Sequence, residues 1–342
     1  MSGMRPGRAL LVPLGGLYGL GALARRAAYR RGLVGQVHLC GPVISVGNLS
    51  VGGSGKTPLV ATIARLVRAA GHPVAILSRG YCGAFSGTAL IVSDGERLLA
   101  DAVSAGDEPV MLARELPGVV VAVGRRRGQV GRAVEERFGA RVHILDDGFQ
   151  HLRLARDLDL VCLAAEDVHD WPLPAGRLRE FRSAVGEAHA VLVSGDEDLL
   201  WTMRQRIGHE RVFGLERSVL GFFDSAGRPQ PAPRRPLAFC GIARPERFMQ
   251  DVAALSGESA GQAAFRDHHA FSASELVGLA RRARSAGADA LVTTAKDIVR
   301  LPEVSLDLPL LVLKISVSVE PEGGFRRLVL ATAARAGEDA GL

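Results

Sequence analysis

The run Ser50-Val51-Gly52-Gly53-Ser54-Gly55-Lys56-Thr57 contains the residue types that bind nucleotide phosphates. In a P-loop, glycines let backbone N–H groups wrap the phosphates, a lysine neutralises the β and γ oxygens, and a hydroxyl holds Mg²⁺. Gly55, Lys56 and Thr57 fit this pattern, although Ser50 stands where the general pattern has glycine. The alternative is a glycine-rich turn that only joins a strand to a helix. Lysine is rare here, with three lysines beside 39 arginines, which favours a role for Lys56.

Two aspartates, Asp146 and Asp147, end an apolar run downstream of the P-loop. An acid at the end of a strand is the second component that a P-loop site uses for Mg²⁺. The alternative is an Asp-Gly turn after a strand, because Gly148 follows Asp147. The sequence therefore offers Thr57, Asp146 and Asp147 as candidate Mg²⁺ ligands and leaves open which aspartate binds the ion directly.

Asp107 and His268 are candidate proton-transfer residues. Asp107 precedes the helical run Val110–Leu116, so it is either the N-cap of that helix or a loop carboxylate that accepts the proton of an attacking hydroxyl. His268 and His269 lie on a predicted loop that could face the P-loop half of the chain. Adjacent histidines lack the separated ligands of a zinc site, and by themselves they indicate catalysis only weakly.

Two arginine-containing runs could bind a phosphorylated substrate. They cover residues 124–127 and 174–180, each beside a predicted strand end, where ligands of open α/β sheets gather. Guanidinium groups bind phosphate in a bidentate manner. For residues 124–127, a solvated basic face is an equally open alternative. For Tyr81, which is also a candidate, the alternative is a side chain packed on the protein. The candidate substrate residues are Arg79, Tyr81, Arg125, His151 and Arg177.

The elements that must position these residues alternate between short β-branched runs and helical patterns from residue 43 to about residue 200. This alternation is typical of a parallel sheet covered by helices. The helical run Thr57–Ala70 follows the P-loop and ends before Gly71, which completes a strand–helix–strand unit. The predicted strands are Val43–Val46, Val74–Leu77, Val119–Val123, Val142–Leu145, Leu158–Leu163 and Ala190–Val193.

A second α/β pattern begins after residues 221–236, which are predicted to form a linker or an exposed hairpin. Its predicted elements are strand Leu237–Cys240, helix Pro245–Leu255, a helix after Phe271 with a capping box of Ser272 and Glu275, and strands Ala290–Thr293 and Leu310–Ile315. A chain of 342 residues favours two domains. We expect a P-loop NTPase-like α/β domain over 36–220 and a smaller α/β domain over 221–342.

The first 35 residues carry the whole of the net charge of +6, because they hold six arginines and no acid. Removing these six from the 42 basic residues leaves 36, which equals the number of acidic residues. The uncharged run Ala9–Ala24 is shorter than the roughly 20 apolar residues of a membrane-crossing helix, and arginines follow it where a signal peptide would have a cleavage site. We predict an interfacial anchor on anionic lipid, with a helix packed on the protein's own core as the alternative.

Composition excludes several classes of protein. The chain is 47% hydrophobic and 23% charged, as in ordinary globular proteins. Because the basic surplus lies on an apolar segment and only 5% of residues are aromatic, nucleic-acid binding is disfavoured. The cysteines form no C-x-x-C pair, so we expect buried thiols, with no zinc site or redox dithiol among them.

The ordered set of motifs closely resembles the tetraacyldisaccharide 4'-kinase family, the lipid A kinases of Gram-negative bacteria. The resemblance extends from the N-terminal anchor to about residue 300, and Ser50 matches that family's form of the P-loop. The motifs that carry it are Val46-Gly47-Asn48, Gly52-Gly53-Ser54-Gly55-Lys56-Thr57-Pro58, Ser78-Arg79-Gly80-Tyr81, Gly106-Asp107-Glu108-Pro109, Asp146-Asp147-Gly148-Phe149-Gln150-His151, Pro174-Ala175-Gly176-Arg177-Leu178-Arg179-Glu180 and Asp267-His268.

This resemblance implies transfer of the γ-phosphate of ATP, with Mg²⁺, to the 4'-hydroxyl of an acylated glucosamine disaccharide 1-phosphate. The reaction would take place at the cytoplasmic face of the inner membrane. The resemblance also implies that Asp107 is the catalytic base and that His268 pairs with it. Thr57, Asp146 and Asp147 would serve the Mg²⁺ and phosphate site.

Two other P-loop functions compete with this interpretation. A membrane-associated ATPase switch would use the same loop to control partner binding, and its hydrolysis of ATP would not depend on a lipid. A GTPase would need an Asn/Thr-Lys-x-Asp guanine reader, and the nearest run, residues 293–297, lacks that spacing.

Overall fold

The computed structural model describes residues 8, 10–52, 55–195, 197–207 and 211–335. Gly53 and Ser54 of the predicted P-loop lie outside the described residues. Within them, the strands are β1 (Val43–Asn48), β2 (Val74–Ser78), β3 (Leu90–Ser93), β4 (Val120–Val123), β5 (Val142–Asp146), β6 (Leu158–Ala164), β7 (Ala190–Ser194), β8 (Val212–Phe223), β9 (Pro229–Gln230), β10 (Pro236–Cys240), β11 (Gly261–Ala264), β12 (Ala290–Thr294) and β13 (Leu310–Glu320).

Nine α-helices and three 3₁₀ helices accompany these strands in the described part of the chain. The α-helices are α2 (Val12–Arg30), α3 (Lys56–Ala69), α4 (Ala102–Ala105), α5 (Asp107–Glu115), α6 (Arg127–Phe138), α7 (Glu197–Ile207), α8 (Pro245–Leu255), α9 (Ala273–Ser285) and α10 (Glu322–Ala334). The 3₁₀ helices are η1 (Ala165–His169), η2 (Arg182–Glu187) and η3 (Ile298–Arg300).

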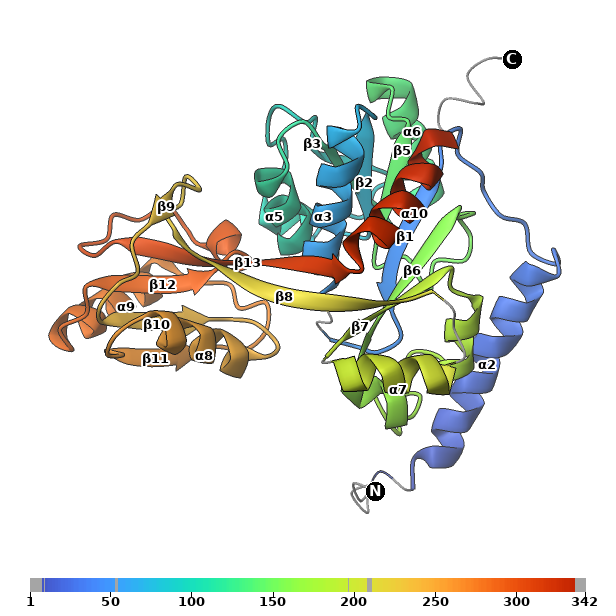
Figure 1. Cartoon of the computed structure of the whole chain (residues 1–342). Helices are drawn as coiled ribbons and strands as arrows, with labels where there is room; N and C mark the ends of the chain where they lie inside the picture. The colour runs from blue at the N-terminus through green and yellow to red at the C-terminus, as the bar shows by residue number, and fades with distance from the viewer. Residues whose placement is uncertain (1–7, 9, 53–54, 196, 208–210, 336–342) are drawn as a thin grey trace.

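All of the strands join one 13-stranded sheet that runs through both lobes of the molecule (Figure 1). The order is β11-β10-β12-β13-β8-β7-β6-β1-β5-β2-β4-β3, with β9 paired to β8. Most pairs are parallel; β3 with β4, β8 with β13 and β8 with β9 are antiparallel. The expected mostly parallel α/β sheet is confirmed.

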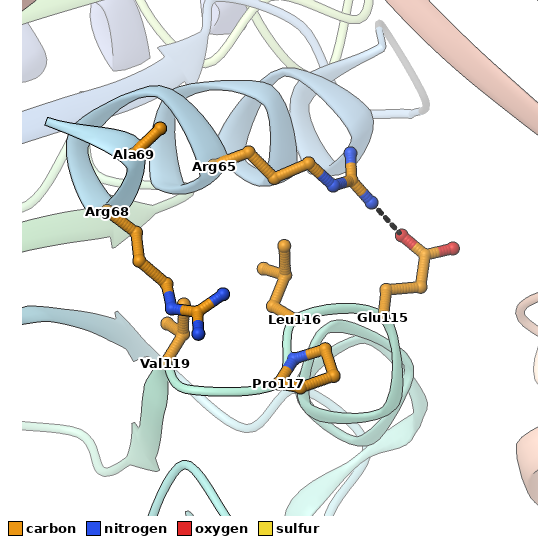
Figure 2. A pocket seen from close by; sticks show the side chains of 7 residues that line it. All are labelled: Arg65, Arg68, Ala69, Glu115, Leu116, Pro117 and Val119. Carbon is orange, nitrogen blue, oxygen red and sulfur yellow. Dashed lines mark ion pairs between the residues drawn. The ribbon is translucent and has the colours of Figure 1, made fainter.

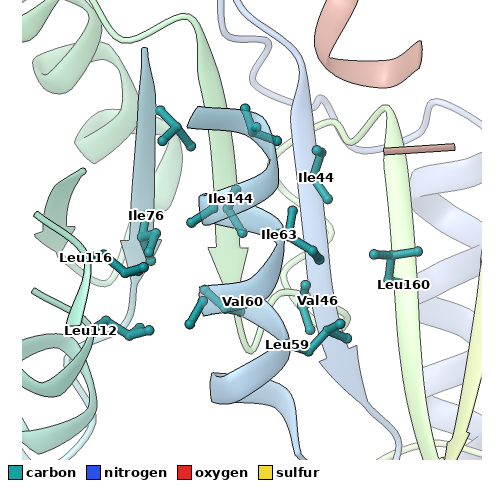
Figure 3. Packing of buried hydrophobic residues seen from close by; sticks show 14 of the residues in the cluster. Ile44, Val46, Leu59, Val60, Ile63, Ile76, Leu112, Leu116, Ile144 and Leu160 are labelled. Atoms are coloured by element: carbon teal, nitrogen blue, oxygen red, sulfur yellow. The ribbon is translucent and has the colours of Figure 1, made fainter. Parts of the chain in front are cut away.

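Strand β1 lies in the middle of the first lobe, between the parallel strands β5 and β6. Every residue of β1 is buried, which explains its continuous run of apolar and small residues. Helix α3 covers this part of the sheet, and its Leu59 and Ile63 are fully buried against Ile44 of β1 and Ile144 of β5 (Figure 3). Each such side chain contributes about 1.5–3 kcal/mol by burial. This packing fixes the helix whose first residue is Lys56.

The two lobes are joined by the long antiparallel pair β8 and β13 (Figure 1). The expected boundary at residue 221 falls inside β8, and the expected exposed hairpin near it is the β8–β9 turn. The second lobe holds β10, β11 and β12 with α8 and α9, and the capping box of Ser272 and Glu275 forms as predicted.

The C-terminal end of the chain returns to the first lobe. Helix α10 follows β13 and packs against α3, and its Phe325 and Val329 belong to the same buried cluster as Ile44. The smaller lobe therefore ends within β13, rather than extending to residue 342 as the sequence suggested. The reason is that α10 carries apolar residues that complete the cover of α3.

Helix α2 lies along the first lobe and extends away from the second (Figure 1). One of its faces packs on the lobe through Gly15, Gly19 and Arg26, and another exposes Leu14, Leu17 and Leu20. The packed face agrees with the alternative of a helix on the protein's own core, and the interfacial anchor stays a prediction. Among the described helices, none combines the length and apolar character that crossing a membrane requires.

The prediction that all four cysteines are buried is wrong for two of them. Cys162 and Cys240 are buried in β6 and β10, but Cys40 and Cys82 are exposed. Cys82 lies on the loop after β2, and Cys40 lies on the extended segment before β1, so neither belongs to a strand that the core covers.

Candidate active site

The P-loop joins β1 to α3, at the carboxyl end of the parallel strands. Asn48, the last residue of β1, donates a side-chain hydrogen bond to the carbonyl of Ser50 at 2.7 Å. Gly52 and Gly55 have φ of 116° and 79°, values that favour glycine, and Gly55 is the N-cap of α3. The described part of the loop therefore has the backbone that the sequence predicted.

Lys56 is held between two acceptors. Its Nζ lies 2.7 Å from Oδ1 of Asn48 and 2.7 Å from Oδ1 of Asp147. Asp147 also accepts from Nη1 of Arg179 at 2.8 Å. Lys56 of the predicted P-loop and the acidic turn after β5 thus form one cluster, although they are far apart in the sequence.

The two neighbouring aspartates have opposite pKa shifts. Burial would raise the pKa of Asp147, but Lys56 and Arg179 outweigh burial and lower it to about 2. Burial, reinforced by the charge of Glu108, raises the pKa of Asp146 to about 7, although Lys56 opposes the shift. Neighbouring carboxylates whose environments separate their pKa values are typical of functional sites.

The residues fit Mg²⁺. Oδ1 of Asp146 is buried and has no hydrogen-bond partner among the described residues, and Oδ2 accepts a 3.3 Å bond from Oγ of Ser78. No group of three or more His, Cys, Asp or Glu side chains in the described residues could hold a metal alone. Mg²⁺ commonly takes one or two carboxylates and completes its octahedron with phosphate oxygens and water, so a lone orphaned carboxylate oxygen beside a P-loop suits it.

Asp107 and His268 come from different lobes and contact each other. Oδ2 of Asp107 lies 2.9 Å from Nδ1 of His268, and Asp107 is only 3% exposed. Asp107 is the first residue of α5 and Gly106 is its N-cap, so the helix begins earlier than the sequence suggested, and Asp107 is neither the N-cap nor on a loop. His268 has φ of 58°, a conformation that costs about 1–3 kcal/mol in a residue other than glycine.

Further charged side chains surround this pair, namely Lys296, Arg300, Glu108 and Asp267. Nζ of Lys296 lies 3.3 Å from Oε1 of Glu108, 3.4 Å from Nε2 of His268 and 3.9 Å from Oδ2 of Asp107. Burial would lower the pKa of Lys296, but Glu108, Asp107 and Asp267 outweigh it and raise the pKa. Nε of Arg300 lies 3.6 Å from Oδ2 of Asp107. Lys296 and Arg300 follow β12, so the second lobe supplies the cations of this cluster.

The predicted substrate residues differ in their exposure to solvent and in their neighbours. Tyr81 is exposed, with its ring edge against His268 at a centroid distance of 5.5 Å. Arg79 and Arg125 are exposed just after β2 and β4. In the triple-arginine run it is Arg127 that is buried near the two aspartates; burial and the charge of Arg79 lower its pKa to about 10.

Residues 177–180 form backbone hydrogen bonds with the segment 49–51 at the start of the P-loop. The amide of Val51 donates to the carbonyl of Arg177 at 2.9 Å, and the amide of Arg179 donates to the carbonyl of Leu49. The guanidinium of Arg177 binds Asp170, with Nε to Oδ2 at 2.9 Å, whereas that of Arg179 reaches Asp147. Of these two arginines, it is Arg179 that joins the cluster of Lys56 and Asp147.

His151 ends the acidic turn and lies among arginines. Burial, followed by the charges of Arg127, Arg156, Arg25 and Arg153, lowers its pKa to about 3. In an unfolded chain the pKa of histidine is about 6.5. Between these values the unfolded chain binds a proton that the folded protein does not, so the free energy of unfolding decreases as the pH falls through this window.

We therefore expect His151→Gln to lose less thermal stability than the wild type when the pH is lowered from about 7.5 to about 5. The glutamine cannot titrate, so its contribution to the pH dependence disappears. Melting temperatures of both proteins at both pH values check this. An equal loss in the two proteins would mean that His151 titrates alike in the folded and unfolded states.

Two cavities lie away from this site. One, of about 450 Å³, is lined by Arg65, Arg68 and Glu115 together with apolar residues, at the ends of α3 and α5 opposite to Lys56 and Asp107 (Figure 2). The other, of about 510 Å³, is lined by residues that include Val43 and Asp157, at the amino ends of β1 and β6. Neither cavity belongs to the cluster described above.

Several residues of these clusters were not predicted from the sequence. The scarcity of lysine in the sequence singles out Lys296 as much as Lys56. Charge runs pointed to Arg125 and Arg177, but a run does not reveal which of its members turns inward. The residues missed are Asn48, Glu108, Arg127, Arg179, Lys296 and Arg300.

This chain is similar to known proteins over most of its length. The profile of a family described as Tetraacyldisaccharide-1-P 4'-kinase matches residues 7–334. A tetraacyldisaccharide 4'-kinase of Desulfotalea psychrophila is 40% identical over 339 residues, which cover 95% of this chain and 97% of that protein. One from Anaeromyxobacter sp. (strain Fw109-5) is 44% identical over 315 residues, which cover 86% and 84%.

A solved structure is similar over nearly the same length. It is the crystal structure of the "apo" form of LpxK from Aquifex aeolicus in complex with ATP, with a TM-score of 0.79 and 31% sequence identity. The similarity covers 95% of this chain and 99% of that one. Because the family match spans both lobes and relatives reach this identity over most of their length, the chain belongs to the tetraacyldisaccharide 4'-kinase family.

Proposed function

We propose that this chain transfers the γ-phosphate of ATP to the 4'-hydroxyl of a tetraacyldisaccharide 1-phosphate, a step of lipid A biosynthesis. The observation that carries the proposal is the contact between Asp107 and His268 across the two lobes. Glu108, the residue after Asp107, acts through its charge on Asp146 of the acidic turn that holds Lys56. Family membership supplies the acceptor. A switch ATPase would have no need for a buried carboxylate paired with a histidine from another lobe.

Asp107 is proposed to accept the proton of the 4'-hydroxyl as that oxygen attacks the γ-phosphorus. The bond from the γ-phosphorus to the β,γ-bridging oxygen breaks, and ADP leaves with the bond's electron pair. His268 orients the carboxylate through the 2.9 Å contact. Lys56 lies at the P-loop, where its ammonium neutralises charge on the transferring phosphate.

Mg²⁺ would be held by Asp146 with Thr57, and it would supply positive charge that neutralises the phosphates of the nucleotide. Asp147 is engaged by Lys56 and Arg179, which supports Asp146 as the direct ligand. After burial, the charge of Glu108 is the largest cause that raises the pKa of Asp146, which makes Glu108 a candidate to assist at this site.

The N-terminal segment is proposed to hold the protein at the cytoplasmic face of the inner membrane of a Gram-negative bacterium. The exposed leucines of α2 would enter the acyl boundary, and its exposed arginines would meet anionic headgroups. A water-insoluble acceptor makes such an attachment useful, because the active site and the lipid then share one surface.

The function is tested by incubating the purified protein with labelled ATP, Mg²⁺ and tetraacyldisaccharide 1-phosphate. We expect a bisphosphorylated lipid, and hydrolysis of ATP that is slow without the lipid. ATP hydrolysis at an undiminished rate without lipid, and no labelled lipid in its presence, would instead favour the ATPase switch.

The role of His268 gives a separate prediction. His268→Ala is expected to lower turnover by about 10²-fold, because the carboxylate of Asp107 loses the partner that orients it, while ATP affinity changes little. Steady-state turnover and nucleotide binding measured side by side check this. His269→Ala is the matched control, since His269 binds Glu275 and stacks on Phe265 away from Asp107. Unchanged turnover in His268→Ala would contradict the coupling of the lobes through this pair.

A further inference from the structure

Helix α2 is fitted closely to the first lobe along one side. A Cβ atom on Gly19 would lie 2.4 Å from the ring of Phe181, and one on Gly15 would lie 2.8 Å from the carbonyl oxygen of Pro172, so only glycine permits this approach. Ahead of the helix, Arg8 donates to the carbonyl of Ala175 at 2.8 Å. A helix that served only as a flexible tether to a lipid surface would not require such a fit.

Arg26 is the buried charge in this contact. It is 2% exposed, and its Nε and Nη2 donate to the two carboxylate oxygens of Glu180 at 2.7 and 3.0 Å. Glu187 lies 3.4 Å from its Nη1. Burial alone would lower the pKa of Arg26, but Glu180 and Glu187 outweigh burial and raise it. A desolvated bidentate pair of this kind fixes geometry more than an exposed pair does.

The same guanidinium lies on the loop that follows the two aspartates. Its Cζ is 4.2 Å from the ring centroid of Phe149, and its Nη2 lies 3.4 Å from the Phe149 carbonyl. Arg25 donates to the carbonyl of Gln150 at 3.1 Å. Phe149 is fully buried against β1, where a Cβ on Gly47 would lie 2.4 Å from it. The loop is therefore held between the helix and the central strand.

From this loop, contacts lead directly to the phosphate site. The side chain of Gln150 donates to the carbonyl of Asn48 at 2.9 Å and accepts from Nη1 of Arg179 at 3.2 Å. Arg179 binds Asp147, and Asp147 and Asn48 together hold Lys56. Glu180, the partner of Arg26, is the residue after Arg179. Arg26 thus contacts both segments that position the lysine.

We propose that Arg26 is a positioning residue for the nucleotide site: the docked helix α2 holds the 147–150 loop and the 177–180 segment in register through it. The inference rests on the proposed binding of nucleotide at the P-loop and adds a second role to a helix whose other face is proposed to meet lipid. The chemistry at the phosphates remains that of Lys56 and the aspartates. Arg156 also donates to the Phe149 carbonyl, at 3.1 Å, so the loop is expected to loosen rather than unfold without Arg26.

The test uses the full chain, MgATP and no lipid acceptor. Arg26→Met is expected to weaken MgATP binding about tenfold, within the usual range of coupling between sites. With the lipid acceptor, KM for ATP should rise while KM for the acceptor stays unchanged. Arg26→Lys should recover part of the loss, because it keeps the charge without the bidentate fork. Binding to vesicles containing anionic phospholipid should remain as in the wild type.

Arg30→Met is the matched comparison. Arg30 lies one turn further along α2 and pairs with Glu187 at the surface, without contact to the loop, so MgATP affinity should stay unchanged.

If Arg26→Met does not fold, the double change Arg26→Met with Glu180→Gln removes the unpaired buried carboxylate and is expected to show the same weakened binding. Wild-type MgATP affinity in a folded Arg26 variant, or loss of vesicle binding alone, would overturn the proposal. If the wild type binds MgATP but phosphorylates no disaccharide, the proposed acceptor is wrong, and the effect of Arg26 on MgATP binding can still be tested.

Discussion

Replacing Asp107 with asparagine is expected to lower turnover by roughly 10²–10⁴-fold while MgATP still binds. Asparagine has nearly the same shape, but it cannot accept the proton of the attacking hydroxyl. The carboxylate is buried and its Oδ2 is 2.9 Å from His268, so neither water nor a flexible neighbour can readily replace it. The measurement is kcat with labelled ATP and the disaccharide, beside a nucleotide-binding titration.

Asp101→Asn provides the matched control for this change. Asp101 caps the neighbouring helix α4 by accepting from the amide of Ser104, and asparagine caps helices about as well. The same chemical replacement a few residues away should leave turnover as in the wild type. If Asp107→Asn kept near-normal turnover, Asp107 would be a structural partner of His268 and the base would have to be sought among other residues.

Lys56→Met is the second change with a large expected effect. Removing the ammonium takes away the charge aimed at the transferring phosphate, and a loss of about 10²–10³-fold in kcat/KM for ATP is expected. The change also leaves Asp147 without one of its two cations, so the low pKa of that carboxyl should rise towards its ordinary value. Lys56→Arg is expected to restore little, because a planar guanidinium does not fit the position of a compact ammonium between Asn48 and Asp147.

Lys314→Met serves as the control for the lysine change. Lys314 lies in β13 with its Nζ 4.7 Å from the ring centroid of Phe223, apart from the P-loop cluster. Its replacement should leave kcat/KM for ATP as in the wild type. Equal losses in the two lysine variants would point to a general effect of lowering the net charge, and unchanged kcat/KM in Lys56→Met would remove Lys56 from the phosphate site.

The parts of this protein that could be predicted are those whose cause is local. The strands around the P-loop are continuous apolar runs, since a parallel strand is buried on both faces, and helix α3 shows the spacing of one apolar face. The capping box at Ser272 is likewise set within four residues. Sequence reasoning therefore found these elements to within a few residues of their observed ends.

The features that could not be predicted from the sequence depend on partners elsewhere in the chain. Strand β8 continues through the expected boundary because β13 pairs with it along its length. Helix α10 belongs to the first lobe because α3 leaves an apolar face for it to cover. Helix α5 begins at Asp107, three residues before its apolar run; its N-cap Gly106, with φ of 88°, lies so near the loop after β2 that a Cβ atom would be 2.4 Å from the carbonyl oxygen of Tyr81.

The amino-acid sequence by itself determined that the chain has a P-loop, an acidic turn and a set of motifs in the order of one kinase family, because such features are short and carry their own backbone requirements. Tertiary structure alone decided which residues meet. Asp107 reaches His268, Lys56 reaches Asp147, and Arg26 reaches Phe149, each across more than 90 positions of the chain. Such contacts follow from how the sheet brings strand ends and covering helices together, and no local pattern records that arrangement.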